Sequence, residues 1–179
     1  MSIEKYENPK RFPKVPIERR GYAFLLDFVT IWILSSLAGD NTALKGLVFM
    51  VLWLALRVVL VSKNKGQSLG SWAFDMKVLE TEYNKVPGVV TLAKREGILG
   101  FFALLATIGL TIGLANGISL LVLISPLIGD CTIALSDPDN QQTFHDRIAQ
   151  TIMVQTRRGF SLDVRLRKMF ALIKGRMQK

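Results

Sequence analysis

Four long apolar stretches constrain this chain more than any other feature of its sequence. They cover, in round numbers, residues 22–38, 44–61, 98–114 and 118–135. A helix needs ~20 apolar residues to cross the hydrocarbon core of a membrane, and about 17 is the practical minimum. Because backbone groups inside lipid must bond within their own segment, such stretches are helical. The sequence therefore predicts an all-α membrane protein with about four transmembrane helices.

Short polar connectors join these stretches in two pairs. Gly39-Asp40-Asn41-Thr42 separates the first pair, and Ala115-Asn116-Gly117 separates the second pair. Two helices joined by so few residues lie antiparallel. We therefore expect two helical hairpins, connected by the longer segment 62–96.

Basic residues are concentrated outside the apolar stretches, and the chain carries a formal net charge of +9. Lys and Arg outnumber Asp and Glu in residues 1–20, 62–96 and 136–179. A nucleic-acid-binding protein would gather this charge on one folded face, so nucleic acid is not an expected partner. The positive-inside rule instead places all three segments, and both termini, in the cytoplasm.

We divide the chain into a cytoplasmic N-terminal extension at 1–16, a transmembrane domain at 17–156 and a basic tail at 157–179. Residues 76–80 and 151–155 contain β-branched side chains and predict two short strands. Their pairing would form a small sheet on the cytoplasmic face of the membrane.

The tail predicts a basic amphipathic helix. Leu162, Leu166 and Met169 fall on one helical stripe, and basic residues occupy the remaining surface. We expect this helix to lie on anionic lipid headgroups, with docking on a partner protein as the alternative. The basic residues assigned to this contact are Arg165, Arg167, Lys168, Lys174 and Arg176.

Ionisable residues inside the apolar stretches are the strongest functional signal. Asp27, Arg57 and Asp130 lie at similar depths near the cytoplasmic ends of three different stretches, and Arg20 lies two helical turns before Asp27. An intramembrane charge costs on the order of 2.5–3.5 kcal/mol on insertion scales, so it normally has a partner. We predict a cluster in which Arg57 bridges Asp27 and Asp130, while Arg20 closes it at the interface.

Two interpretations of this cluster remain open. In the first, the paired charges are structural and set helix register and topology. In the second, the carboxylates bind and release a proton or cation. Pro126 favours the second, because it should kink the last stretch and free the carbonyl of Val122, and broken helices beside acids form ion sites in transporters.

The remaining candidates have structural explanations. Gly109 and Gly113 form a small-xxx-small spacing that favours close helix packing, within the chain or between chains. Cys131 is expected to be a buried small apolar residue, and a single cysteine builds neither a disulfide framework nor a zinc site. His145 lacks a nucleophile with a supporting constellation, so we expect a local capping or hydrogen-bonding role. We expect no enzyme activity, catalytic residue, metal or cofactor.

Three segments resemble the RDD family of membrane proteins. They are Arg20-Gly-Tyr-Ala23-Phe-Leu-Leu-Asp27, Gly66-Gln67-Ser68-Leu69-Gly70 with Met76-Lys77-Val78-Leu79, and Phe144-His145-Asp146-Arg147-Ile148-Ala149-Gln150-Thr151. The resemblance covers about residues 17–156 and implies that Asp146 is the second family aspartate. The chain departs from it at Ser71-Trp72-Ala73, where relatives often carry basic residues, and at Gln150, where a glycine is usual.

The resemblance implies an α-helical membrane fold. Transport, including cation/proton exchange by some relatives, has been suggested for the family. Beyond the matched region, the N-terminal extension and tail look like those of cyanobacterial members. The expected location is therefore the bacterial inner membrane or, in a cyanobacterium, the thylakoid membrane.

Two functions follow as hypotheses. The first is a non-enzymatic accessory or assembly partner of a larger membrane complex, because four short spans scarcely enclose a pathway and glycine-rich packing surface suits a subunit contact. Its partners would be anionic lipids and other membrane protein subunits, such as a photosynthetic complex in a cyanobacterium. The second is a small oligomeric cation/proton antiporter that uses the intramembrane aspartates.

Overall fold

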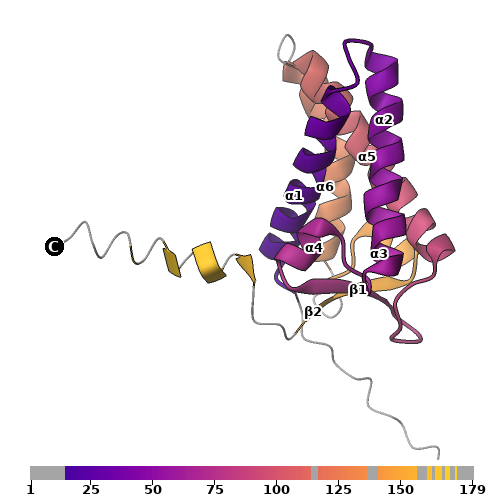
Figure 1. The fold of residues 1–179 in the computed structure, drawn as a ribbon, viewed down its shortest axis with the longest axis vertical. Helices are drawn as coiled ribbons and strands as arrows, with labels where there is room; N and C mark the ends of the chain where they lie inside the picture. The colour runs from indigo at the N-terminus through magenta and orange to yellow at the C-terminus, as the bar shows by residue number, and fades with distance from the viewer. Residues whose placement is uncertain are drawn as a thin grey trace, which may run out of the picture.

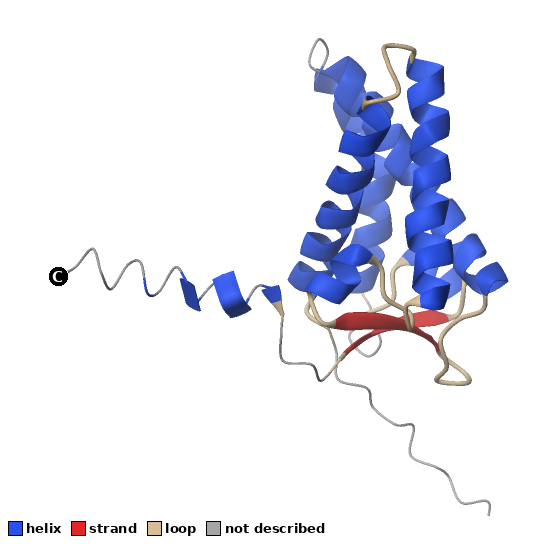
Figure 2. Cartoon of the chain, in the orientation of Figure 1, coloured by secondary structure: helices blue, strands red, loops and turns tan. Residues whose placement is uncertain are grey.

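The computed structural model of this chain describes residues 15–113, 117–136, 141–156, 161–162, 164–166, 168–169 and 172. The long helices α1, α2, α5 and α6 run alongside one another, and the two strands lie across one end of them (Figures 1 and 2). The helical elements are α1 (Ile17–Ser36), α2 (Thr42–Leu54), the π-helical turn η1 (Ala55–Val59), α3 (Leu60–Lys63), α4 (Leu69–Ala73), α5 (Val89–Gly113), α6 (Gly117–Leu135) and α7 (Phe144–Ile148).

Each of the four predicted apolar stretches is helical over most of its described residues. The continuous helix Thr42–Lys63, formed by α2, η1 and α3, and the helix Gly117–Leu135 are long and apolar enough to cross a membrane. The prediction of a mostly helical chain with membrane-like helices is therefore confirmed, with two helices meeting the criterion for a span among the residues described.

The first hairpin turns where the sequence has its polar connector. Gly39 adopts a φ of 94°, a conformation that an L side chain rarely takes. Asn41 then caps α2, because its side-chain oxygen accepts hydrogen bonds from the backbone N–H groups of Ala43 and Leu44, at 2.9 and 3.2 Å. These bonds satisfy donors that the first helical turn leaves without partners.

The second hairpin differs from the prediction at its start. Helix α5 begins at Val89, whereas the apolar stretch begins at residue 98, so the last part of the expected loop is helical. A helix can extend beyond the apolar core of a membrane because its backbone bonds are internal in either solvent. At the other end of α5, a Cβ added to Gly109 would lie 3.0 Å from the Cβ of Leu123 on α6. The glycine therefore allows close packing within the hairpin.

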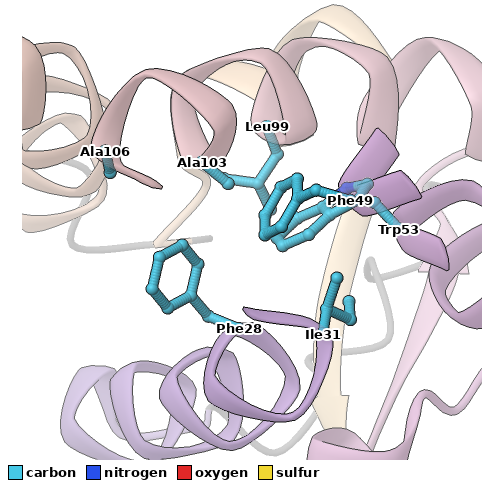
Figure 3. Close-up of a cluster of buried hydrophobic side chains, with 7 residues drawn as sticks. All are labelled: Phe28, Ile31, Phe49, Trp53, Leu99, Ala103 and Ala106. Carbon is cyan, nitrogen blue, oxygen red and sulfur yellow. The ribbon is translucent and has the colours of Figure 1, made fainter. Parts of the chain in front are cut away.

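The hydrophobic core lies between α1, α2 and α5 (Figure 3). Aromatic rings dominate it: Phe49 and Trp53 stack with their ring centroids 5.6 Å apart, and Phe28 meets Phe49 edge-on at 6.0 Å. Gly100 on α5 leaves room for Trp53, because an added Cβ would lie 2.7 Å from the indole ring. The cluster consists of Phe28, Ile31, Phe49, Trp53, Leu99, Ala103 and Ala106.

The predicted strand pair is confirmed. Strands β1 (Met76–Glu80) and β2 (Thr151–Gln155) pair antiparallel, with Met76 opposite Gln155 and Glu80 opposite Thr151. Gln150, which directly precedes β2, has a φ of 52°. The left-handed turn typical of glycine is therefore present at this position although the residue is glutamine.

Two predicted features, the kink at Pro126 and the helical tail, are only partly tested by the described residues. Helix α6 continues through Pro126, and the hydroxyl of Ser125 donates a hydrogen bond of 2.8 Å to the carbonyl of Val122, which the proline leaves without its usual donor. The kink itself remains a prediction. In the tail, Arg165 and Lys168 lie in helical, exposed positions. Arg167, Lys174 and Arg176 lie outside the described residues.

Candidate functional site

A network of ionised side chains is buried where the helices meet the strand pair. It links α1, η1, α5 and α7 through a continuous series of ion pairs. In order along the series, its members are Asp27, Arg57, Glu96, Arg95, Asp146 and Arg20. We refer to these six residues as the buried ion-pair network.

Asp27 occupies one end of the network and is only 3% exposed. Its carboxylate accepts hydrogen bonds from Arg57 Nη1 and Ser68 Oγ, both at 2.6 Å, and from the Gly70 N–H at 2.7 Å. Three donors satisfy the hydrogen-bonding capacity of this buried carboxylate. Asp27 thus connects α1 to the segment Ser68–Gly70, which follows α3.

The structure explains why Ser68 and Gly70 occur in the motif at residues 66–70. Ser68 caps α4, because its hydroxyl also accepts a hydrogen bond from the Ser71 N–H at 3.1 Å. At Gly70, an added Cβ would lie 2.0 Å from the carbonyl oxygen of Ala23 on α1. Only glycine allows the two backbones to approach this closely. The motif seen in the sequence is therefore the segment that packs on α1 and supplies two donors to Asp27.

Arg57 lies in the π-helical turn η1, and its guanidinium bridges two acids. Its Nη1 contacts Asp27, while Nε contacts Glu96 Oε2 at 2.6 Å. The guanidinium also stands over the indole of Trp53, 5.1 Å from the ring centroid. Wider π turns interrupt α-helices most often at functional positions. The structure thus brings Arg57 and Asp27 together, with Glu96 as the second acid.

The network continues from Glu96 toward the end of the bundle that carries the strand pair. Arg95 Nη1 contacts Glu96 Oε1 at 2.5 Å, and Arg95 Nε contacts Asp146 Oδ1 at 2.8 Å. Asp146 also pairs with Arg20, which donates a second hydrogen bond to the carbonyl of Gln141. Arg20 therefore pairs with Asp146 and not with Asp27, and it joins α1 to α7.

Asp146 is fully buried, and its ionisation reflects two opposing effects. Burial alone would raise its pKa, but Arg95, His145 and Arg20 together lower the pKa below its ordinary value of 3.8. The hydroxyl of Thr151 adds a contact to Oδ1 at 3.3 Å. Asp146 is consequently a carboxylate in the folded protein and a counter-ion for two arginines.

Asp130 has a different partner from the one predicted. Its carboxylate accepts a 3.0 Å hydrogen bond from the His145 backbone N–H, and its Oδ2 lies 2.6 Å from His145 Nδ1. The predicted bridge from Arg57 to Asp130 is therefore not among the ion pairs of the described residues. The physical reason is that α7 inserts His145 beneath α6, closer to Asp130 than any arginine. His145 has the hydrogen-bonding role that its isolation in the sequence indicated.

A cavity of about 400 Å³ lies between α1 and α6, next to both groups of charges. Its walls are mostly apolar, with Phe24 and Leu25 of α1 on one side and Leu127 and Ile128 of α6 on the other. Polar side chains that line it are Arg20, Arg57, Ser71, Arg95, Asp130, Thr132, Thr143 and His145. Cys131 also lines it and is exposed, so the expectation of a buried cysteine was wrong.

Arg95 and Glu96 were missed in the sequence because they precede the apolar stretch and resemble loop charges. The signal that reveals them is spacing. Buried positions on α5 recur at Leu92, Arg95, Glu96 and Leu99, which is the three- and four-residue repeat of one helix face. When charged residues lie on an otherwise apolar helix face, we expect them to be buried and to pair with residues of opposite charge. Among the described residues, no group of three or more metal-ligating side chains is gathered.

A comparison with protein families gives a match whose range covers most of the residues described above. The RDD family model matches residues 15–150, which is well over half of the chain and includes the whole buried ion-pair network. No match was found among curated proteins or among solved structures. The resemblance noted in the sequence is thereby confirmed: the chain belongs to the RDD family.

Proposed function

We propose that this protein is a non-enzymatic membrane protein that stabilises or helps to assemble a larger membrane complex. The observation that carries the proposal is the pairing of its buried charges. Each acid of the buried ion-pair network meets at least one arginine from a different element of the fold. Charges used in this way hold helices in register and leave no acid of the network without a cation.

The outer surface of α6 supports a subunit contact. Only 11% of the apolar window of this helix is buried inside the chain, compared with 28% for Thr42–Lys63. Leu121 and Val122 are 69% and 62% exposed, so this face requires lipid or another protein as its partner. The anionic lipid surface is the proposed contact of the basic tail.

The proposed topology has four spans, formed by α1, the helix Thr42–Lys63, α5 and α6, with both termini in the cytoplasm. The concentration of Lys and Arg in the segments at the strand end supports this orientation. Single cysteines at Asp40 and Lys63, in a Cys131→Ser background, test it. An impermeant thiol reagent added outside intact cells should label position 40 and leave position 63 unlabelled; the reverse labelling would disprove the orientation.

Purification from native membranes tests the assembly function. The protein carrying a tag before residue 15 should co-migrate with a complex much larger than itself in mild detergent. Leu121→Trp should weaken this co-migration, because it enlarges an exposed side chain on α6 while keeping it apolar. Leu47→Trp is the matched control on α2, where Leu47 is 62% exposed. Migration of the native protein only as a monomer or homo-oligomer would reject the proposal.

The alternative function is an oligomeric cation/proton antiporter. Its support is the position of Asp130 and His145, which line a cavity while forming a buried acid–imidazole pair. Liposomes that contain the purified protein alone should then show cation-dependent proton flux. Asp130→Asn should abolish the flux in liposomes that contain the same amount of folded protein as those of the wild type. Absence of flux in these liposomes would leave the assembly function as the proposal.

A further inference from the structure

The cavity between α1 and α6 has the form of a site for one amphiphilic molecule. Its volume of about 400 Å³ falls in the range typical of small-molecule pockets, roughly 300–1,000 Å³. A helix about 10 Å in diameter fills roughly 420 Å³ with each 5.4 Å turn. The cavity is therefore no larger than about one turn of a partner helix, and its size is in the range of a small amphiphilic ligand.

Exposed apolar side chains of two helices, α1 and α6, line the cavity. Leu25 on α1 and Ile128 on α6 line the cavity and are 52% and 54% exposed. Leu135, near the end of α6, also lines it and is 68% exposed. In a membrane such side chains contact hydrocarbon, so a molecule can enter the cavity from the lipid without crossing water.

The polarity of the cavity changes along the helices. Arg20 lines it near the start of α1, whereas Leu25 lines it more than one turn further into the bundle. On α6, which runs in the opposite direction, Leu127 and Ile128 precede Asp130. The charged groups that line the cavity therefore lie toward its strand end, where apolar residues such as Ile17, Met76 and Leu135 also line it, and the lining toward the middle of the bundle is apolar. This is the order of headgroup and hydrocarbon in a cytoplasmic leaflet.

We propose that the cavity binds one acyl chain of an anionic membrane lipid, with the lipid headgroup at the Arg20 end. Arg20 is partly exposed there, next to Arg19 at the start of α1. Basic pockets between transmembrane helices on the cytoplasmic side bind anionic headgroups. The proposal is independent of the assembly function, because lipid binding requires no other protein.

Two glycine positions provide matched variants. A Cβ added to Gly21 on α1 or to Gly129 on α6 would meet no atom within 4 Å. Gly21 lines the cavity, whereas Gly129 is not among its lining residues. Gly21→Trp should therefore fill part of the cavity, and Gly129→Trp should add the same side chain to an exposed helix surface without affecting it. Both variants leave the buried ion-pair network unchanged.

Native mass spectrometry of the full-length protein, extracted in mild detergent, measures the bound lipid directly. The wild type and Gly129→Trp should retain one lipid per chain, and Gly21→Trp should lose most of it. Equal retention by the two variants would overturn the proposal, as would a wild type that retains no lipid. If thermal unfolding shows that Gly21→Trp is misfolded, the smaller Gly21→Leu is compared with Gly129→Leu.

Cys131 supplies a second measurement, because it is the single cysteine of the chain and lines the cavity. After lipid removal, phosphatidylglycerol should slow alkylation of Cys131 by N-ethylmaleimide several-fold. Phosphatidylcholine with identical chains should slow it less, and inorganic phosphate alone should not slow it. Equal protection by both lipids would reject the anionic headgroup, and protection by phosphate alone would reject the acyl chain. If Cys131 in the native complex stays protected from N-ethylmaleimide after the lipid is removed, a protein side chain occupies the cavity and the lipid proposal is rejected.

Discussion

Asp27 and Asp130 are the two acids inside the apolar stretches of the sequence, and the structure places them in different surroundings. Asp27 contacts an arginine, a serine hydroxyl and a glycine N–H. Asp130 contacts His145 and lines the cavity. Both are 3% exposed, so burial alone does not distinguish them. The difference is that Asp130 and its partner His145 both line the cavity, whereas Asp27 does not line it and only its partner Arg57 does.

This comparison separates the two interpretations that the sequence left open. The Asp27 region has the features of a structural centre, because its donors come from elements that pack against α1. The Asp130 region has the features of a binding site, because its acid–imidazole pair borders an open volume. Variants in the Asp27 region should therefore change stability most, while variants in the Asp130 region should change it less.

The largest loss is expected for Arg57→Gln. It removes the only arginine that contacts Asp27 in the described structure and one of two that contact Glu96. Breaking a buried pair by removing one partner costs about 3–5 kcal/mol. Thermal unfolding in detergent measures the loss. Adding Asp27→Asn should restore part of it, since the second change removes an unpaired charge; strictly additive losses would show that the two residues are not partners.

Gly70→Ala should cause the second-largest loss of stability. The new Cβ would lie 2.0 Å from the Ala23 carbonyl oxygen, so α4 must move away from α1 and weaken the Gly70 N–H bond to Asp27. Overpacking of this kind costs about 1–3 kcal/mol. Gly21→Ala, at a position with open space around it, is the control for the change in helix propensity. Equal stability of the two variants would contradict the close approach.

Acid pH should act through Asp146, which borders both regions. Its folded pKa is lowered below 3.8, so it contributes stability above about pH 4, and this contribution is lost as the pH falls further. One proton taken up on unfolding changes stability by up to about 1.4 kcal/mol per pH unit. Unfolding measured between pH 5 and pH 2 should show a shallower slope for Asp146→Asn. An unchanged slope would assign acid sensitivity to another group.

Asp130→Asn should cost about 1–2 kcal/mol, less than Arg57→Gln. Asparagine keeps one oxygen for the His145 backbone N–H but removes the carboxylate oxygen that faces Nδ1. Thermal unfolding at neutral pH provides the measurement, with Asp27→Asn as the matched change in the other region. A larger loss at Asp130 than at Asp27 would invert the comparison.

The smallest expected effect is a gain of stability in Gln150→Gly. Gln150 has a φ of 52°, and a left-handed conformation costs an L residue roughly 1–2 kcal/mol relative to the right-handed one. Gln150→Gly relieves this strain but adds backbone entropy to the unfolded chain, so stability should rise by less than about 1 kcal/mol. Gln155→Gly, at the far end of the same strand, should lower stability. A loss at position 150 would mean that the side chain has a contact that outweighs the strain.

Much of the fold follows from local pattern. Hydrophobic length predicted the four helices, the polar connectors predicted the hairpins, and β-branched runs predicted the strand pair. The site was only partly predictable. Asp27 and Arg57 stand out because charge inside an apolar stretch requires a partner, whereas Arg95 and Glu96 lie in a segment whose charges look ordinary until the helix is known to begin at Val89.

The sequence by itself determined the four long apolar helices, the burial of Asp27, Arg57 and Asp130, and the family the chain belongs to, because these depend on composition and short-range spacing. Only the tertiary structure decided the partners. Asp130 lies beside His145, fifteen residues later in the chain, and Arg20 lies beside Asp146, although they are 126 residues apart. Ion pairs form between whichever charges the packed helices bring within contact distance, and that distance depends on helix rotation and on the position of α7 beneath α6.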